Sequence, residues 1–160
     1  MLTNKDYEKA IKEPGFRPEF IEQIELGDLS RYVLKLEYNP YQKERTEMTT
    51  IYPMSASIKG IKRKRSRILI YPLAFSQLLY PNIHDFCASV IYHEGLHAKE
   101  NFEGITLAAR LNNAKDIKIE NAKIELRALS NQARHFNMRN SKTYVNQVRS
   151  RIKAYKRQLE

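Results

Sequence analysis

The stretch ASVIYHEGLHAKE, residues 88–100, decides how the rest of this chain is interpreted. It contains His93 and His97, with Glu94 directly after the first, in the pattern H-E-x-x-H. Residues four apart on a helix lie on the same face, so the two imidazoles can bind one metal ion. Glu94 lies about 100° round the helix from His93, beside the metal, where its carboxylate can take a proton from a metal-bound water. The pattern predicts a metal site of hydrolytic type on a helix.

The residues on either side of the motif predict that this helix is buried. Asn82 is a good N-cap, and the helix is expected to run from there to about Asn101. Apolar side chains lie on most of its sides: Phe86, Cys87, Val90, Ile91 and Ala98. Polar groups buried in such a helix need compensation, which a metal would provide. The alternative is a pair of core histidines satisfied by other hydrogen bonds.

Two other kinds of metal site share part of the pattern. Di-iron carboxylate proteins use E-x-x-H twice, but neither His84 nor His135 has a glutamate three residues before it. Metzincins place a glycine and a histidine three and six residues after the second histidine, where this chain has Glu100 and Glu103. The motif therefore favours a site with one metal ion.

A tetrahedral catalytic zinc needs a third protein ligand and one open position. The downstream carboxylates are Glu100, Glu103, Asp116, Glu120 and Glu125. On a helix over residues 114–136, Glu125 lies at the centre of the apolar face, whereas Glu120 lies among the charged side chains and is expected at the surface. A carboxylate at the centre of an apolar face should bind a metal or pair with a buried Lys or Arg, so Glu125 is the predicted third ligand. Asn121, on the same face, could orient a ligand.

The rest of the chain predicts an α+β fold, with helices, then a small sheet, then helices. The first 28 residues indicate two short helices broken at EPGF. Alternating or β-branched stretches predict about three strands, within residues 31–38, 46–54 and 66–75. Pro72 favours an edge position for the third strand, because proline cannot donate to a ladder. A basic helix over residues 143–160 is expected to follow the third-ligand helix.

Composition limits the class of protein. A chain of 160 residues that is 42% hydrophobic suggests one domain, residues 1–160, with one core. It has one cysteine, no apolar signal segment and no run long enough to span a membrane, so a cytoplasmic location is expected. Residues 59–67 and 137–160 are strongly basic and account for the net charge of +10. They are either solvated surfaces or contacts for a nucleic acid or another polyanion.

HEGLH, followed 28 residues later by ELRA at residues 125–128, resembles a small gluzincin, an H-E-x-x-H zinc metallopeptidase. The form is similar to minigluzincins and to peptidase domains of the ImmA/IrrE type. The resemblance implies a zincin-like fold in which zinc is held by His93, His97 and Glu125, with Glu94 as the general base for peptide-bond hydrolysis. It also implies that a peptide adds to the sheet edge beside the catalytic helix, an edge assigned here to the third strand. The basic loop before that strand would favour acidic peptide or protein substrates.

Two other functions remain open from the sequence. The chain could be a polyanion- or DNA-associated protein with an accessory protease site, or an inactive zincin scaffold that serves as a binding module. The residue that stabilises the transition state is not assigned: Tyr92, His135 and Tyr144 are candidates, each more readily explained as structural. His84 is expected at the surface, and Cys87 is expected to pack in the core.

Overall fold

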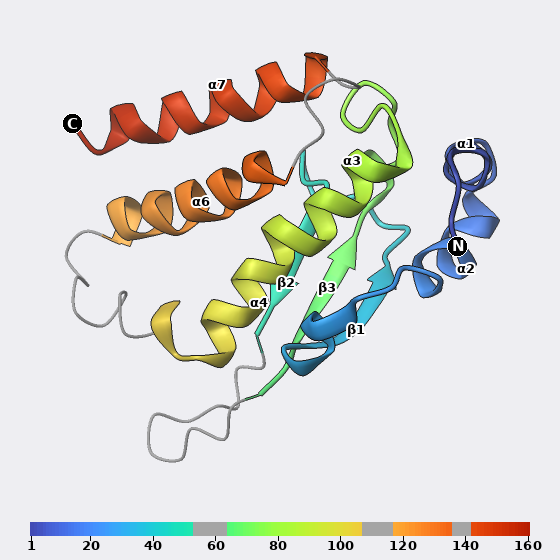
Figure 1. Cartoon of the computed structure of the whole chain (residues 1–160), viewed down its shortest axis with the longest axis horizontal. Coiled ribbons are helices and arrows are strands. Elements are labelled where there is room, and N and C mark those ends of the chain that lie inside the picture. The colour runs from blue at the N-terminus through green and yellow to red at the C-terminus, as the bar shows by residue number, and fades with distance from the viewer. Residues whose placement is uncertain (53–63, 107–116, 136–141) are drawn as a thin grey trace.

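The computed structural model describes residues 1–52, 64–106, 117–135 and 142–160, apart from the side chains of residues 143 and 144. It has the α+β architecture that the sequence predicts. One long helical rod runs alongside a sheet of three strands, with α1 and α2 towards one side of the sheet and α6 and α7 towards the other (Figure 1). Within the described ranges, no helix has both the length and the apolar character needed to cross a membrane.

The sheet consists of β1 (Val33–Tyr38), β2 (Met48–Ile51) and β3 (Ser66–Ile70), in the order β1-β3-β2. β3 is parallel to β1 and antiparallel to β2. The predicted edge position of the third strand is therefore wrong, because β3 is the central strand. Pro72 does not interrupt the ladder, since it lies beyond β3 in the short 3-10 helix η3 (Pro72–Ala74). β2, which contacts the helical rod, is the edge strand on the side of the candidate site.

The N-terminal part forms two short helices, α1 (Asn4–Lys12) and α2 (Arg17–Glu22), separated by the 3-10 turn η1 (Pro14–Phe16), as EPGF predicts. A further 3-10 turn, η2 (Gly27–Arg31), leads into β1. These helices bring aromatic side chains into the core, where Tyr7 and Phe20 pack against Phe86 at ring-centroid distances of 5.3 Å and 5.5 Å. Phe86 is fully buried and belongs to the helical rod, so this cluster fixes the start of the rod against the N-terminal helices.

The rod comprises α3 (Ile83–Ala88), the π-helical segment η4 (Ser89–Glu94) and α4 (Gly95–Phe102). Its start is confirmed, because Asn82 Oδ1 accepts from the backbone N–H of Asp85 at 3.0 Å. The wide turn in the middle was not predicted: the N–H of Gly95 donates to the carbonyl of Val90, five residues back. A β-carbon on Gly95 would lie 2.6 Å from Leu29 Cδ1, so glycine lets the rod pass close to η2.

The third-ligand helix of the prediction is α6 (Ile117–Arg134), and the basic helix is α7 (Lys142–Gln158). Residues 114–116 and 136 of the predicted α6 lie outside the described residues. Two contacts fix α6 on the rod: Arg127 binds both carboxylate oxygens of Glu100, at 2.8 and 2.9 Å, and Asn131 donates to the carbonyl of Tyr92 at 2.8 Å. The expectation that Glu120 is a surface residue is wrong, because it is 6% exposed and pairs with Lys123 at 3.2 Å.

Candidate metal centre

Three side chains from separate elements converge on one point. His93 lies in η4, His97 in α4 and Glu125 in α6. Each carboxylate oxygen of Glu125 faces one imidazole: Oε2 is 3.2 Å from His93 Nε2, and Oε1 is 2.9 Å from His97 Nε2. One potential ligand atom from each of the three residues lies within 4.8 Å of those of the other two. The predicted ligand set is therefore brought together, and Glu125 faces the histidines rather than a buried Lys or Arg.

The pKa values of Glu125 and His93 are shifted by the contacts between these side chains. Burial alone would raise the pKa of Glu125, but hydrogen bonds from His93 and His97 outweigh it and hold that pKa well below its usual range. Burial would lower the pKa of His93, but its hydrogen bond to Glu125 and the charges of Glu94 and Glu125 reverse this and raise it. A proton thus joins imidazole and carboxylate, and a metal bound there would take its place.

Two imidazole nitrogens and one carboxylate are donors that suit a first-row divalent metal ion such as zinc. The group could hold such an ion with three protein ligands and one position left for a solvent or substrate atom. His93 is 9% exposed, and the side chains of His97 and Glu125 are 13% and 36% exposed. The two histidines therefore line the buried side of the group, whereas Glu125 lies at its open side.

Gln132 holds the ring of His93 in one orientation. Its Oε1 lies 3.2 Å from His93 Nδ1, and Gln132 is 2% exposed. When the proton shared with Glu125 is lost, a proton kept on Nδ1 and donated to this oxygen leaves Nε2 with its lone pair towards the centre of the group. Asn121, which the sequence suggested as a residue that orients a ligand, is exposed. Gln132 could have been found from its spacing, because it follows Glu125 by seven residues and so lies on the same face of α6.

Glu94 lies beside the three candidate ligands rather than among them, as the helical angle predicts. It is 6% exposed, and its carboxylate lines the same pocket as His93 and Glu125. The hydroxyl of Thr50, on the edge strand β2, lies 2.6 Å from Glu94 Oε2. The same hydroxyl is 3.1 Å from the backbone carbonyl of Glu94. Thr50 was not identified from the sequence, and nothing local in the sequence indicates that it reaches Glu94.

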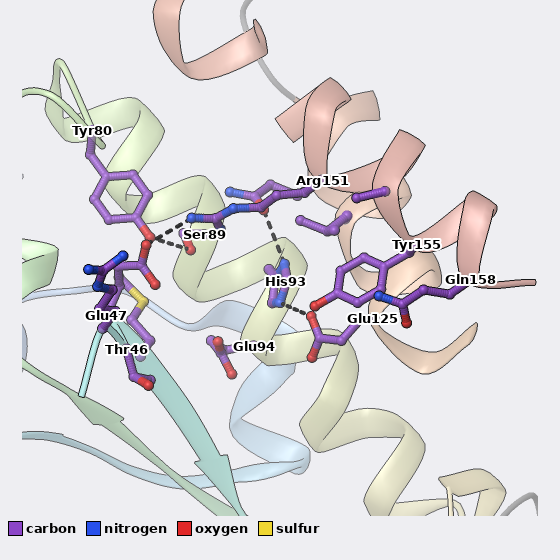
Figure 2. A pocket seen from close by; sticks show the side chains of 15 residues that line it. Thr46, Glu47, Tyr80, Ser89, His93, Glu94, Glu125, Arg151, Tyr155 and Gln158 are labelled. Atoms are coloured by element: carbon purple, nitrogen blue, oxygen red, sulfur yellow. Dashed lines mark hydrogen bonds and ion pairs between the residues drawn. The ribbon is translucent and has the colours of Figure 1, made fainter. Parts of the chain in front are cut away.

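The cluster of His93, His97 and Glu125, called the metal group below, opens into a pocket of about 560 Å³, which Figure 2 shows from close by. Two groups of residues form its other walls: Arg45–Met48 before and at the start of β2, and Arg151, Ala154, Tyr155 and Gln158 on α7. The hydroxyl of Tyr155 points towards Glu125 in this view. Burial, together with the negative charge of Glu125, raises the pKa of Tyr155, so its phenol keeps its proton. A pocket of this size accommodates a few side chains of a peptide.

The remaining site candidates take structural or surface positions. Tyr92 stacks on His135 at 3.8 Å, and neither lines the pocket; the side chain of Tyr144 lies outside the described part of the chain. Tyr155 lines the pocket with its hydroxyl towards Glu125, and it was not among the residues singled out from the sequence. Its signal was the spacing of Val145, Val148, Ile152 and Tyr155, which places it on the face of α7 that packs inwards.

Of the other candidate ligands that the structure describes, none joins the group of His93, His97 and Glu125. Glu100 is bound by Arg127, and Glu103 is exposed at the end of α4. His84 is exposed, as expected. Cys87 packs against the core, and burial raises the pKa of its thiol to about 11, which excludes a thiolate at neutral pH.

Comparisons with known proteins add no family to this description. The chain matches no protein-family model, no curated protein and no solved structure.

Proposed function

We propose that this protein is a zinc-dependent peptide hydrolase. The observation that carries the proposal is the convergence of His93, His97 and Glu125 at the head of a pocket, with the carboxylate of Glu94 lining the same space. A ligand set without a carboxylate beside it would support metal binding alone. A buried carboxylate next to the group adds a base for a hydrolytic reaction.

Zinc is the metal that fits this donor set best, and when bound it supplies a Lewis acid that lowers the pKa of a water and polarises a carbonyl. Glu94 accepts the proton of the attacking water and passes it to the leaving amine. Thr50 donates to Glu94 Oε2 and holds the carboxylate in place. Gln132 keeps the ring of His93 oriented. Tyr155 keeps its proton and donates it in a hydrogen bond to the oxyanion that forms on the substrate.

The position of β2 supports a peptide as the substrate. β2 is an edge strand, so one side of its backbone has no strand partner within the described sheet. An extended peptide can add to such an edge by main-chain hydrogen bonds. Thr50 belongs to this strand and contacts Glu94, so a peptide held on the edge would lie next to the base.

Metal analysis with an activity assay tests the proposal. The purified protein should retain about one zinc per chain after dialysis against metal-free buffer, and it should cleave an unstructured protein such as casein. Glu94→Gln should keep the zinc and lose nearly all cleavage, whereas Glu103→Gln, at an exposed position, should change neither. Cleavage unchanged in Glu94→Gln would remove Glu94 from the reaction. Zinc bound without cleavage of any protein or peptide would favour the binding-module function instead.

A second candidate function is contact with a polyanion such as DNA, and α7 supplies the observation that favours it. On a regular helix, five exposed basic residues of α7 fall within about 100° of one another: Lys142, Arg149, Lys153, Lys156 and Arg157. In the other basic segment, Arg67 is paired with Glu37, and residues 59–63 lie outside the described residues. Binding to double-stranded DNA should weaken steeply with salt, and replacing Arg149, Lys153 and Lys156 by Gln should reduce that slope. If the protein does not bind DNA at low salt, the basic residues of α7 form only a solvated surface.

A further inference from the structure

The pocket has a second end, away from Glu125, where the charges differ from those around the metal group. Arg151 extends from α7 across this end towards Glu47, and Tyr80 and Ser89 lie beside them (Figure 2). Arg151 Nη2 binds Glu47 Oε1 at 2.9 Å, and the hydroxyls of Tyr80 and Ser89 are 3.1 Å apart. Arg45, at the turn before β2, lines the same pocket and is exposed.

We propose that this end of the pocket is a specificity site for a carboxylate of the substrate, bound by Arg151 and Arg45. The proposal rests on the proposed peptidase function, because it concerns what the same pocket selects. The carboxylate could be the side chain of Asp or Glu or the C-terminus of a peptide, since both present the same two oxygens to a guanidinium.

The exposed fractions of the two side chains in the ion pair indicate whether a negatively or a positively charged ligand would bind there. The side chain of Arg151 is 45% exposed, whereas that of Glu47 is 18% exposed. A group that enters the pocket therefore meets the guanidinium more readily than the carboxylate of Glu47. Outside the metal group and Glu94, the charged residues in the described lining are Arg45, Glu47 and Arg151, with a net charge of +1. This surplus favours an anion and opposes a lysine or arginine side chain.

The position of this end relative to the metal group suits a residue next to the bond that is cut. Ser89 precedes His93 by four residues on the same helical rod, so the two lie about one turn, or roughly 5–6 Å, apart. An acidic side chain next to the scissile carbonyl, or a C-terminal carboxylate one residue beyond it, spans that distance. Tyr80 is 3% exposed, and its buried phenol closes this end of the pocket.

Metal-directed probes test the charge preference without requiring turnover. Three hydroxamates of matched length would be titrated into the zinc-loaded protein by calorimetry: glutaric monohydroxamate, its terminal amide and 5-aminopentanohydroxamate. The carboxylate probe should bind about tenfold or more tightly than the amide, because a charge-assisted hydrogen bond distinguishes them. The ammonium probe should bind most weakly.

Variants assign the preference to the two arginines. Arg45→Gln and Arg151→Gln should each reduce the advantage of the carboxylate probe, and Arg45 lies at an exposed turn where the change leaves the core intact. Glu47→Gln should increase that advantage, because it removes the acid that competes for Arg151. Arg134→Gln, an exposed change on the neighbouring helix α6 and outside the pocket, is the matched control and should have no effect.

The outcomes separate this inference from the proposed function. Equal affinity for the three probes, or tightest binding of the ammonium probe, would overturn the inference and leave the zinc site intact. Failure of the protein to bind zinc or any hydroxamate would overturn both. The source of the carboxylate follows from hydrolysis of matched peptides: Glu against Gln beside the cleaved bond identifies a side chain, and a free against an amidated C-terminus identifies a terminal carboxylate.

Discussion

The hydroxyl of Thr50 lies 2.6 Å from the carboxylate oxygen Oε2 of Glu94, although the two residues are 44 positions apart in the chain. Thr50 is on the edge strand β2, and Glu94 ends the π-helical segment of the rod. The same hydroxyl lies 3.1 Å from the backbone carbonyl of Glu94. One side chain of the sheet thus joins the proposed general base to the strand that would hold a peptide.

If this bond positions the base, Thr50→Val should lower kcat about tenfold or more with little change in KM. Valine keeps the shape of threonine but cannot donate, and a hydrogen bond to a charged group contributes about 1.5–3 kcal/mol. Thr50→Ser restores the donor and should recover most of the rate. Steady-state kinetics on a cleaved peptide would measure this. Equal kcat for the valine and serine variants would show that the contact is only structural.

Glu125→Ala should lower the affinity for zinc by more than about 100-fold, a larger effect than the loss of an outer hydrogen bond to a ligand. The wild-type protein should gain about 2.7 kcal/mol of unfolding free energy when free zinc is 100 times its dissociation constant, and the variant should gain less than about 0.4 kcal/mol at the same concentration. Competition with a chelator and thermal unfolding would measure both. Glu103→Ala is the control. Glu120→Ala is unsuitable, because Glu120 is buried against Lys123.

Gln132→Leu should weaken zinc binding about 10- to 100-fold, because His93 loses the acceptor that fixes its ring. The unfolding free energy of the metal-free protein should change much less. The Nε2 of Gln132 has no hydrogen-bond partner in the described part of the chain, so leucine removes a buried donor as well as the useful acceptor. Gln132→Glu, which keeps an acceptor, should retain most of the zinc affinity. Equal losses in the two variants would argue against the orienting role.

The pKa shifts predict that zinc and protons act oppositely on stability. In the metal-free protein the pKa of His93 is raised, so its contribution to the unfolding free energy is full below its ordinary pKa of about 6.5 and is lost as the pH rises. The lowered pKa of Glu125 contributes above about 4.3 and is lost as the pH falls below that. Zinc needs the deprotonated imidazole.

The difference in Tm between the zinc-loaded and metal-free protein should therefore widen from about pH 6 to about pH 8. Thermal unfolding with and without a chelator, at fixed free zinc, would measure it. A difference in Tm that does not change over this range would mean that His93 exchanges no proton when the metal binds.

The sequence by itself determined the parts of this protein that depend on local periodicity. The spacing of four residues places His93 and His97 on one side of the rod, and the amphipathic pattern of α6 turns Glu125 inwards. The N-cap at Asn82, the break at EPGF and the α+β order of elements also follow from residues close in sequence.

Only the tertiary structure decided which distant residues meet. The alternating pattern of one strand does not reveal which strands lie on either side of it. Pro72 therefore suggested an edge position for β3, which is the central strand. Glu120 was assigned to the surface because helical angle gives a face but not what covers it. The contacts of Gln132 with His93 and of Thr50 with Glu94 span 39 and 44 residues. Such contacts depend on how helices and strands pack, and packing joins side chains whose local sequences carry no sign of one another.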